Sequence, residues 1–248
     1  HIRETGATID GHRLRFTSAG GAPLDPALKR NCETLFGQPL HNGYGMTEAS
    51  PSVAMTRVDC PRHDTSVGQA LPFVEVIVVD AEGKALPRGE SGDVWCRGPG
   101  IMKGYYRAPE LTKAAINPQG WLITGDVGCF DADDSLHIVG RSKELIIRSG
   151  FNVYPPEVEG VLSAHPKVVQ AAVVGAPGGD GNEEVVAYLQ VPPADRPSLE
   201  ALAAHCAARL APYKRPTRYV LCETLPATPT GKILKHRLAA LAQPLPEG

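Results

Sequence analysis

The pattern of apolar and polar positions predicts an α/β segment at the start of the chain. Residues 14–17 are typical of a strand, and the glycines that follow at 20 and 21 indicate a turn. Asp25 then fits the cap position of a helix. Apolar side chains recur at helical spacing along that helix, at Leu28, Cys32, Leu35 and Phe36.

The pattern of apolar and polar residues changes between residues 67 and 139. Short strand-like runs at residues 74–79, 92–97 and 136–139 are separated by turn residues, as at 80–83. A helix is expected near residues 110–116. This segment therefore predicts a small β-rich subdomain with one inserted helix.

Beyond Arg141 the chain alternates strands and helices. The predicted order is strand, helix, strand, strand, helix, strand and helix, at residues 145–147, 155–164, 168–174, 184–191, 198–209, 219–222 and 235–242. A segment of about one hundred residues is a typical domain size, so we predict a separate α+β domain. The proline-rich residues 191–197 fall between a strand and a helix of that domain and are interpreted as a surface loop.

The predicted fold class is therefore α/β and α+β, in two parts. The expected boundaries are 1–140 for the first part, with an α/β portion at 1–66 and the β-rich subdomain at 67–140, then a junction at 141–143 and a small domain at 144–248. The basic pair Arg141 and Lys143 occupies the junction. We predict that it is a hinge and that the small domain is mobile.

Composition and charge exclude several classes of function. Lys and Arg total 25 against 27 for Asp and Glu, so no strong field favours nucleic acid or anionic lipid. Apolar runs stay short of the roughly 20 residues that a membrane helix needs. Six scattered cysteines without a C-x-x-C pair favour reduced thiols in a cytoplasmic protein, and eight dispersed histidines give no support for a hydrolase triad. Because the chain starts without Met, close to a core strand, we expect it to be a piece of a longer protein.

The first candidate motif lies at residues 43–48. Its two glycines would let the backbone approach a ligand, Thr47 offers a hydroxyl to a phosphate, and Glu48 is a carboxylate of the kind that Mg²⁺ favours. The alternative is a plain loop with a chance helix cap at Thr47.

Three further motifs follow in order. Asp126 ends an apolar run, and a carboxylate at a strand end can accept hydrogen bonds from ribose hydroxyls, although a simple turn residue is the alternative. Arg141 and Lys143 precede a segment around Gly150. The alternative interpretation of this segment is a solvated linker followed by a helix cap.

Lys232 follows Gly231 near the C-terminus, where its ammonium could neutralise charge developing in acyl transfer. Pro226 and Ile233 occupy places where a phosphate-loop motif needs Gly and Ser or Thr.

In their order and spacing, the four motifs resemble the acyl-adenylate-forming (AMP-binding) superfamily. That superfamily comprises acyl-CoA synthetases, adenylation domains of peptide synthetases and beetle luciferases, and residues 43–55 look most like aryl and medium-chain acyl-CoA ligases such as 4-coumarate-CoA ligase. The resemblance implies the end of a large adenylate-forming domain followed by a mobile C-terminal domain, that is, a C-terminal half. The family's upstream phosphate loop has no counterpart in these residues, so we expect no turnover by the chain alone.

The resemblance also implies residue roles. Nucleotide contacts are expected at Gly20, Gly21, Ala22, Pro23, Asn42, Gly43, Tyr44, Gly45, Met46, Thr47, Asp126, Arg141 and Lys232. Within this set Tyr44 would pack on adenine, Thr47 would bind the α-phosphate, and Asp126 would take the ribose hydroxyls with help from Arg141. Glu48 would hold Mg²⁺, Lys232 would act in adenylation, Lys143 would be the hinge, and Gly150 would serve the coenzyme A step.

The implied activity is an AMP-forming acid–CoA ligase. Its cofactors would be ATP, Mg²⁺ and coenzyme A, and its substrate a small carboxylic acid, with aryl and medium-chain acids favoured. No nucleic acid partner or membrane span is expected, and the resemblance leaves room for a homodimer. Two alternatives stay open, namely an adenylation domain that loads a carrier protein, and a noncatalytic remnant that binds AMP or a partner.

Overall fold

The computed structural model describes residues 9, 13–178, 182–229 and 231–242. The chain divides into two compact units, one of His1–Thr124 with Gly128–Ile138 and one of Gly125–Val127 with Val139–Gly248. The division therefore falls within strands β7 (Leu122–Phe130) and β8 (Leu136–Arg141).

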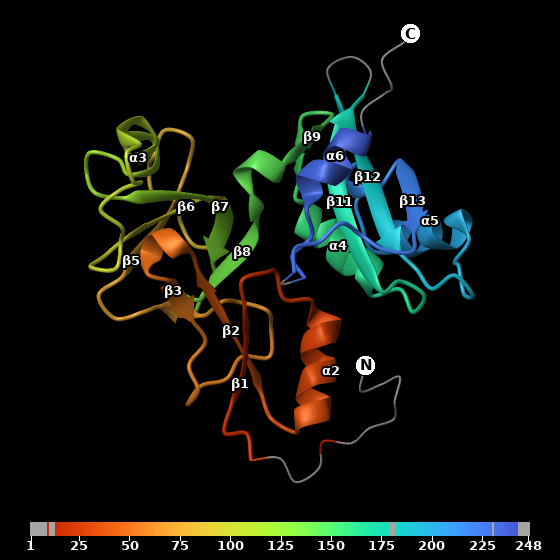
Figure 1. Cartoon of the computed structure of the whole chain (residues 1–248), viewed down its shortest axis with the longest axis horizontal. Coiled ribbons are helices and arrows are strands. Elements are labelled where there is room, and N and C mark those ends of the chain that lie inside the picture. The colour runs from red at the N-terminus through yellow and green to blue at the C-terminus, as the bar shows by residue number, and fades with distance from the viewer. Residues whose placement is uncertain (1–8, 10–12, 179–181, 230, 243–248) are drawn as a thin grey trace. The chain divides into compact units, whose positions relative to one another are not determined.

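The first unit opens with a four-stranded sheet (Figure 1). Its strands are β1 (Thr17–Gly20), β2 (Leu40–Gly45), β3 (Ser52–Met55) and β4 (Gln69–Ala70), in that order. β1 and β2 are parallel, and the helix α2 (Pro26–Phe36) forms the connection between them that a parallel pair requires. β3 runs antiparallel to both β2 and β4.

The local sequence explains where α2 begins and ends. The Asp25 carboxylate accepts a hydrogen bond from the Leu28 backbone N–H at 2.8 Å, which confirms the predicted cap, and Gly37 ends the helix in a left-handed conformation. Lys29 is the buried residue of this helix, and its ammonium donates to the Leu40 carbonyl at 2.6 Å. Leu28 and Leu35 are exposed.

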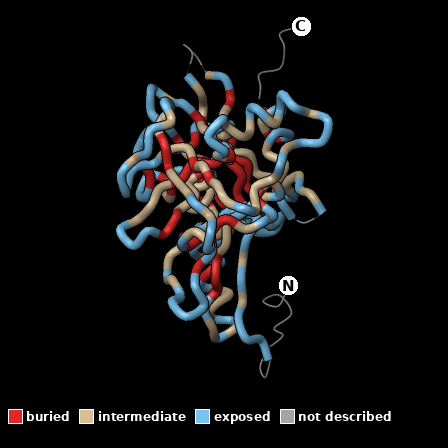
Figure 2. Tube along the Cα trace, turned by 90° about the vertical axis from the view of Figure 1, so that its left-hand side faces the viewer, coloured by how far each residue is buried: buried red, intermediate tan, exposed pale blue. Residues whose placement is uncertain are grey.

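A second sheet has the order β5 (Glu75–Val79), β6 (Gly92–Arg97), β7 and β8, with the helix α3 (Pro109–Ala115) between β6 and β7. The predicted turn at 80–83 is present, because Asp80 Oδ1 accepts hydrogen bonds from the Glu82 and Lys84 N–H groups. In Figure 2 the buried residues are coloured red along the chain trace. In this unit the cores include Val78, Val94 and Leu136 in one cluster, and Val53, Cys96 and Leu122 in another.

The second unit is a three-layered α+β domain. Its sheet has the order β11 (Gln170–Pro177), β12 (Glu183–Gln190) and β13 (Arg218–Cys222), antiparallel and then parallel. One face, with Val173 and Val185, packs on α4 (Pro155–Ser163) and α5 (Leu199–Ala207). The other face, with Val174 and Val186, packs on α6 (Lys235–Ala242). Burial of both faces explains why these strands read as continuous apolar runs.

Short elements complete this unit. They are the 3₁₀ turn η2 (Ser142–Glu144), the hairpin of β9 (Ile146–Arg148) and β10 (Phe151–Val153), and the 3₁₀ turn η4 (Pro212–Lys214). Residues 192–196 form the exposed loop that their prolines predict.

Two structural predictions were wrong. The first strand was expected at residues 14–17, but β1 lies at Thr17–Gly20, so Gly20 ends the strand and does not belong to the turn. Asp126 was expected at the end of a strand, but it lies inside β7, which continues to Phe130. Gly125 has φ 72°, so it bends the backbone without ending the strand. β2, β3, β4 and β10 were not predicted as strands.

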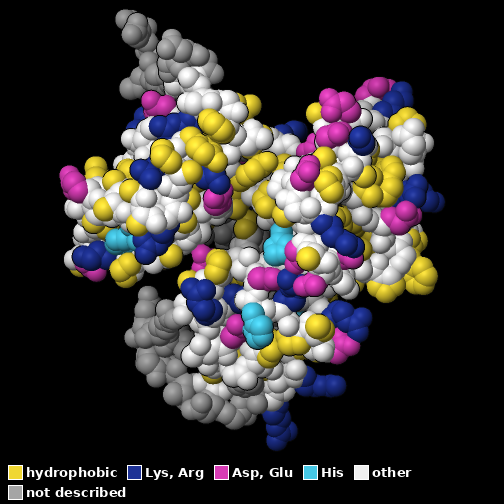
Figure 3. Space-filling model, turned by 180° about the vertical axis from the view of Figure 1, so that it is seen from behind, with side chains coloured by type: hydrophobic (Ala, Val, Ile, Leu, Met, Phe, Trp, Pro, Cys, Tyr) yellow, Lys and Arg dark blue, Asp and Glu magenta, His cyan; other side chains and the backbone are white. Residues whose placement is uncertain are grey.

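The surface agrees with a nearly neutral composition. On the face shown in Figure 3, basic and acidic side chains lie interspersed rather than in one field of a single sign. Among the described residues, no helix combines the length and apolar character that crossing a membrane requires.

Candidate functional site

Two predicted nucleotide-binding segments leave the same edge of one sheet. Gly20 ends β1 opposite Gly43 in the parallel strand β2, which continues to Gly45. Residues 21–23 and 46–48 therefore both follow carboxyl ends of neighbouring strands. In α/β folds this edge is the usual place for a ligand. All four residues from 20 to 23 are exposed.

The turn after β2 has a fixed shape. The Met46 N–H donates to the Pro51 carbonyl at 2.7 Å, and Thr47 to Ala49 form the 3₁₀ turn η1. A Cβ on Gly45 would lie 2.0 Å from the Pro51 carbonyl oxygen, whereas a Cβ on Gly43 would meet ordinary contacts from 3.6 Å. Gly45 is therefore required by the closure of this turn, independently of any ligand.

We expect Gly45→Ala to destabilise the chain by about 3 kcal/mol, because the backbone around Pro51 must move to admit the methyl group. Gly43→Ala is the matched control from the same strand and should cost less than about 1 kcal/mol, the usual penalty range of a tolerated core change. Urea denaturation of both variants tests this. Equal losses would show that Gly45 is not sterically confined.

Glu48 is held by a residue that the sequence did not single out. The Tyr105 hydroxyl donates to Glu48 Oε1 at 2.8 Å, and this hydrogen bond raises the pKa of Tyr105. Tyr105 is itself fixed by a hydrogen bond from its N–H to Thr112 Oγ1 at 2.9 Å. The Glu48 carbonyl also accepts from the Met102 N–H. Thr47, by contrast, is exposed at the start of η1.

Asn42 and Tyr44 are engaged within the protein. The Asn42 amide donates to the Thr65 carbonyl at 2.9 Å, and its Oδ1 accepts from the Gly43 N–H at 3.0 Å. Asn42 is buried, and Tyr44 is half-buried against both cores of the first unit. Their expected nucleotide contacts stay predictions.

In the second unit, Asp126 and Arg141 form an ion pair. The Arg141 Nε donates to Asp126 Oδ1 at 3.0 Å; the Asp126 side chain is 6% exposed and that of Arg141 is 53% exposed. The carboxylate is therefore oriented by a guanidinium that faces solvent. Two residues on, Lys143 is exposed in η2.

Gly150 lies at the tip of a tight hairpin. Arg148 pairs with Phe151, and the two turn residues Ser149 and Gly150 have φ 52° and 78°, as the two-residue turns with left-handed backbone require. The hairpin is anchored beside this turn, where Arg148 Nη1 donates to the Arg215 carbonyl at 2.7 Å. The Phe151 ring stacks on Tyr213 with centroids 4.6 Å apart.

Lys232 is exposed on another tight turn. Ala227 and Ile233 form an isolated bridge, the Thr228 N–H donates to the Lys232 carbonyl at 2.8 Å, and the Lys232 N–H donates to Thr228 Oγ1 at 3.1 Å. Gly231 has φ 85° within this turn. The backbone of Lys232 is thus fixed while its side chain reaches solvent.

A cluster of two aspartates and one histidine outside these segments has the spacing of metal ligands. Oxygen or nitrogen atoms of Asp64, Asp131 and His137 lie within 4.8 Å of one another. However, the Arg62 guanidinium already donates to Asp64 at 3.0 Å and to Asp131 at 2.7 Å. We interpret the cluster as an ion-pair network that ties residues 62–64 to the β7–β8 turn.

This network predicts acid sensitivity. Burial alone would raise the pKa of Asp64, but hydrogen bonds from Arg62 and Ser66 outweigh it and hold that pKa well below its usual range. Its contribution to stability is therefore present above the unfolded pKa of about 3.9 and lost as pH falls toward the lower folded value.

We expect Asp64→Asn to lower the urea midpoint at pH 6, and the difference from wild type to shrink progressively as the pH falls below about 3.9. Asp59→Asn is the control, because the Arg57–Asp59 pair has the same spacing but is exposed on both sides. It should change the midpoint little at either pH. A constant difference between wild type and Asp64→Asn would contradict the pKa assignment.

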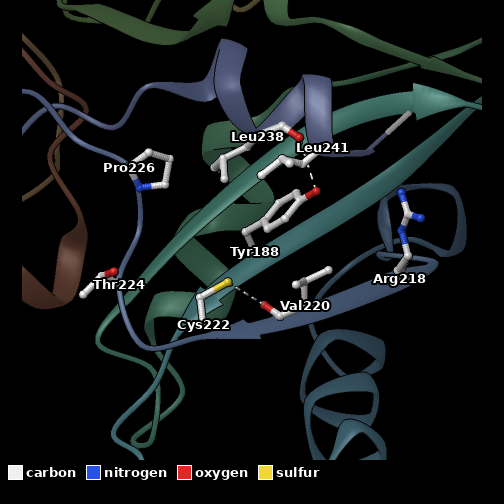
Figure 4. Close-up of a pocket in the computed structure, with 8 residues that line it drawn as sticks. All are labelled: Tyr188, Arg218, Val220, Cys222, Thr224, Pro226, Leu238 and Leu241. Carbon is white, nitrogen blue, oxygen red and sulfur yellow. Dashed lines mark hydrogen bonds between the residues drawn. The ribbon is translucent and has the colours of Figure 1, made fainter. Parts of the chain in front are cut away.

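The described part of the second unit also has a surface pocket of about 360 Å³, between α6 and β13 (Figure 4). Its lining is mainly apolar, and the Tyr188 hydroxyl donates to the Leu238 carbonyl at 3.2 Å within it. None of the predicted site residues lines this pocket, so it gives no support to their assignment.

Comparison with known proteins identifies the family. The AMP-binding enzyme model matches residues 3–106, and the AMP-binding enzyme C-terminal domain model matches residues 157–232. The first range contains the 42–48 segment and the second ends at Lys232. Asp126, Arg141, Lys143 and Gly150 lie between the two ranges. The chain belongs to the AMP-binding enzyme family.

Individual relatives agree with this. A long-chain-fatty-acid–CoA ligase of Yersinia pestis is 38% identical over 230 residues, which are 93% of this chain and 41% of the relative. Among solved structures, ATP-bound MatB from Rhodopseudomonas palustris has 36% identity and a TM-score of 0.87, over 92% of this chain and 45% of that one. The anthranilate CoA ligase AuaEII in complex with anthranoyl-AMP has 31% identity and a TM-score of 0.86, over 93% and 45%. The mixed α/β fold is thus that of adenylate-forming enzymes, and the chain spans less than half the length of these relatives.

Proposed function

We propose that the protein containing this chain is an ATP-dependent acid–CoA ligase that activates its acid as an acyl-adenylate. The observation that carries the proposal is the pair of family matches, which include the Thr47–Glu48 turn in one unit and Lys232 in the other. The similarity to an ATP-bound structure and to a CoA ligase holding an acyl-adenylate supports ATP and coenzyme A as its substrates.

In the first step a carboxylate oxygen of the acid attacks the α-phosphorus of ATP, and the bond to the β-phosphate oxygen breaks, releasing pyrophosphate. Negative charge develops on the phosphate oxygens and must be stabilised. Lys232 supplies a positive charge from a turn with a fixed backbone, and the Thr47 hydroxyl donates a hydrogen bond. The Asp126 carboxylate, which Arg141 orients, accepts hydrogen bonds from the ribose hydroxyls.

Glu48 fits a magnesium site. It offers a carboxylate that is partly exposed and is oriented by the Tyr105 hydroxyl. Mg²⁺ is usually held by one or two carboxylates together with substrate phosphates and water, so one protein ligand is adequate. When bound, the ion would neutralise phosphate charge.

In the second step the thiol of coenzyme A attacks the acyl carbonyl, a thioester forms and AMP leaves. We propose that the small domain, residues 144–248, pivots about Lys143 between the steps, so that Lys232 withdraws and the Gly150 hairpin takes its place. Gly150 is exposed, and the hairpin that carries it is anchored through Arg148, which suits a segment that is presented as a unit.

The acid is proposed to be small, with aryl and medium-chain acids favoured. Similarity to an anthranilate ligase supports an aryl acid, whereas similarity to a long-chain-fatty-acid ligase supports a longer aliphatic one. Acid-dependent exchange of pyrophosphate into ATP by the full-length protein, over a panel of both kinds, tests the activity. Thioester formation with free coenzyme A or with carrier protein then identifies the acceptor. Absence of exchange with every acid would favour a noncatalytic binding role.

A further inference from the structure

The turn that carries Lys232 leads directly into a buried ionic junction. Three residues after Lys232, α6 begins at Lys235. The Lys235 ammonium lies 2.9 Å from Glu144 Oε2 and 2.8 Å from Glu159 Oε1. Its side chain is only 19% exposed, and that of Glu159 is 15% exposed. One ammonium therefore joins the start of α6 to η2 and to α4.

The two carboxylates have different attachments. Glu159 Oε1 also accepts a hydrogen bond from the Val173 N–H at 2.7 Å, so it fixes Lys235 to the interior of the domain, between α4 and β11. Glu144 belongs to η2 and directly follows Lys143. The Glu144 bond therefore fixes Lys235 to the segment at the proposed hinge.

Folding shifts the pKa values of Lys235 and Glu159 in this junction. Burial alone would lower the pKa of Lys235, but the two neighbouring carboxylates outweigh it and raise that pKa, so the ammonium stays protonated. Burial raises the pKa of Glu159, and the hydrogen bonds from Lys235 and the Val173 N–H oppose that rise. Removing the Glu144 carboxylate would leave a balanced Lys235–Glu159 pair, which avoids the large penalty of an unpaired buried charge.

We propose that Lys235 is a positioning residue, and that its bond to Glu144 holds the Lys232 turn in register with the hinge segment at Lys143. The turn that carries Lys232 then moves together with the first residues after the hinge. Rotation of the domain about Lys143 therefore displaces the Lys232 ammonium by the full extent of the rotation. This inference rests on the proposed roles of Lys232 and Lys143. It adds Glu144 and Lys235 as the connection between them.

The test compares half-reactions in the full-length protein. Glu144→Ala should lower kcat of acid-dependent ATP–pyrophosphate exchange by about tenfold, because misplacement by an ångström can cost up to about 100-fold. It should leave KM for ATP and thioester formation from preformed acyl-adenylate within about twofold of wild type. Glu144→Gln keeps an oxygen that can accept from Lys235 and should recover most of the exchange rate. Amide hydrogen exchange of residues 226–234 should be faster in Glu144→Ala.

Glu157→Ala is the matched control. Glu157 pairs with Lys214 in the same domain at similar exposure, and its loss should leave the exchange rate unchanged. Wild-type exchange by Glu144→Ala, in a protein where Lys232→Ala abolishes exchange, would overturn the proposal and leave the proposed function intact. An equal fall of both half-reactions with a lowered Tm would also overturn it, as a purely structural role. Unchanged exchange in Lys232→Ala would instead contradict the proposed function.

Discussion

Lys232→Ala in the full-length protein is expected to lower the rate of adenylate formation by at least about 100-fold, the usual scale for losing an electrostatic stabiliser of a transition state. Lys232 is exposed, and its turn is closed by backbone hydrogen bonds and a bond to Thr228, none of which needs the ammonium. The substitution should therefore leave the fold unchanged. The measurement is acid-dependent exchange of pyrophosphate into ATP.

The second half-reaction separates this role from others. Supplied with preformed acyl-adenylate, Lys232→Ala should form thioester at a rate within a few-fold of wild type, because in the proposed mechanism its ammonium acts in the first step only. Lys167→Ala, which removes a surface ammonium paired with Asp195 in the same unit, should change neither rate. A parallel loss of both half-reactions would show that Lys232 serves binding or folding instead.

Much of the second unit could be predicted because its signals are local. The apolar runs of β11 and β12 and the spacing of α4 and α6 each lie within a few residues, and α6 begins and ends where its pattern predicts. Ser198 caps α5 with its own hydroxyl, which accepts from the Ala201 N–H. In such segments the local preference and the tertiary environment agree.

The strands of the first unit were harder, because their identity depends on partners far along the chain. Residues 40–45 contain two glycines, an asparagine and a histidine, a composition that favours a loop. They form β2 because β1 and β3 pair with them on both sides. The boundary after Asp126 was misplaced for a similar reason, since Gly125 suggests a turn while pairing within the sheet continues.

The candidate site divides in the same way. Thr47, Glu48 and Lys232 could be selected as candidates from short motifs, because each lies within three residues of a glycine in its motif. Their supporting residues could not. Tyr105 is 57 positions from Glu48, and Lys235 is 91 positions from Glu144, so only the folded chain brings each pair into contact.

Asp126→Ala is expected to raise KM for ATP by at least about 100-fold in the full-length protein. If both ribose hydroxyls donate to this carboxylate, two charge-assisted hydrogen bonds are lost, each worth roughly 1.5–3 kcal/mol. The fold should tolerate the change, since Arg141 is half-exposed and water can solvate its guanidinium once the partner is gone. kcat at saturating ATP should fall much less than kcat/KM, because ribose is bound alike before and during the reaction.

Two comparisons make this result specific to the ribose contact. With 2′,3′-dideoxy-ATP as substrate, the KM of wild type should be raised as much as Asp126→Ala raises the KM for ATP. Asp126→Ala should then raise the KM for the dideoxy nucleotide little further, because the hydroxyls that would donate to Asp126 are absent. Asp195→Ala removes an exposed carboxylate in the same unit and should leave KM for either nucleotide unchanged. A full additional loss by Asp126→Ala with the dideoxy nucleotide would show that Asp126 acts on another part of the substrate or only through Arg141.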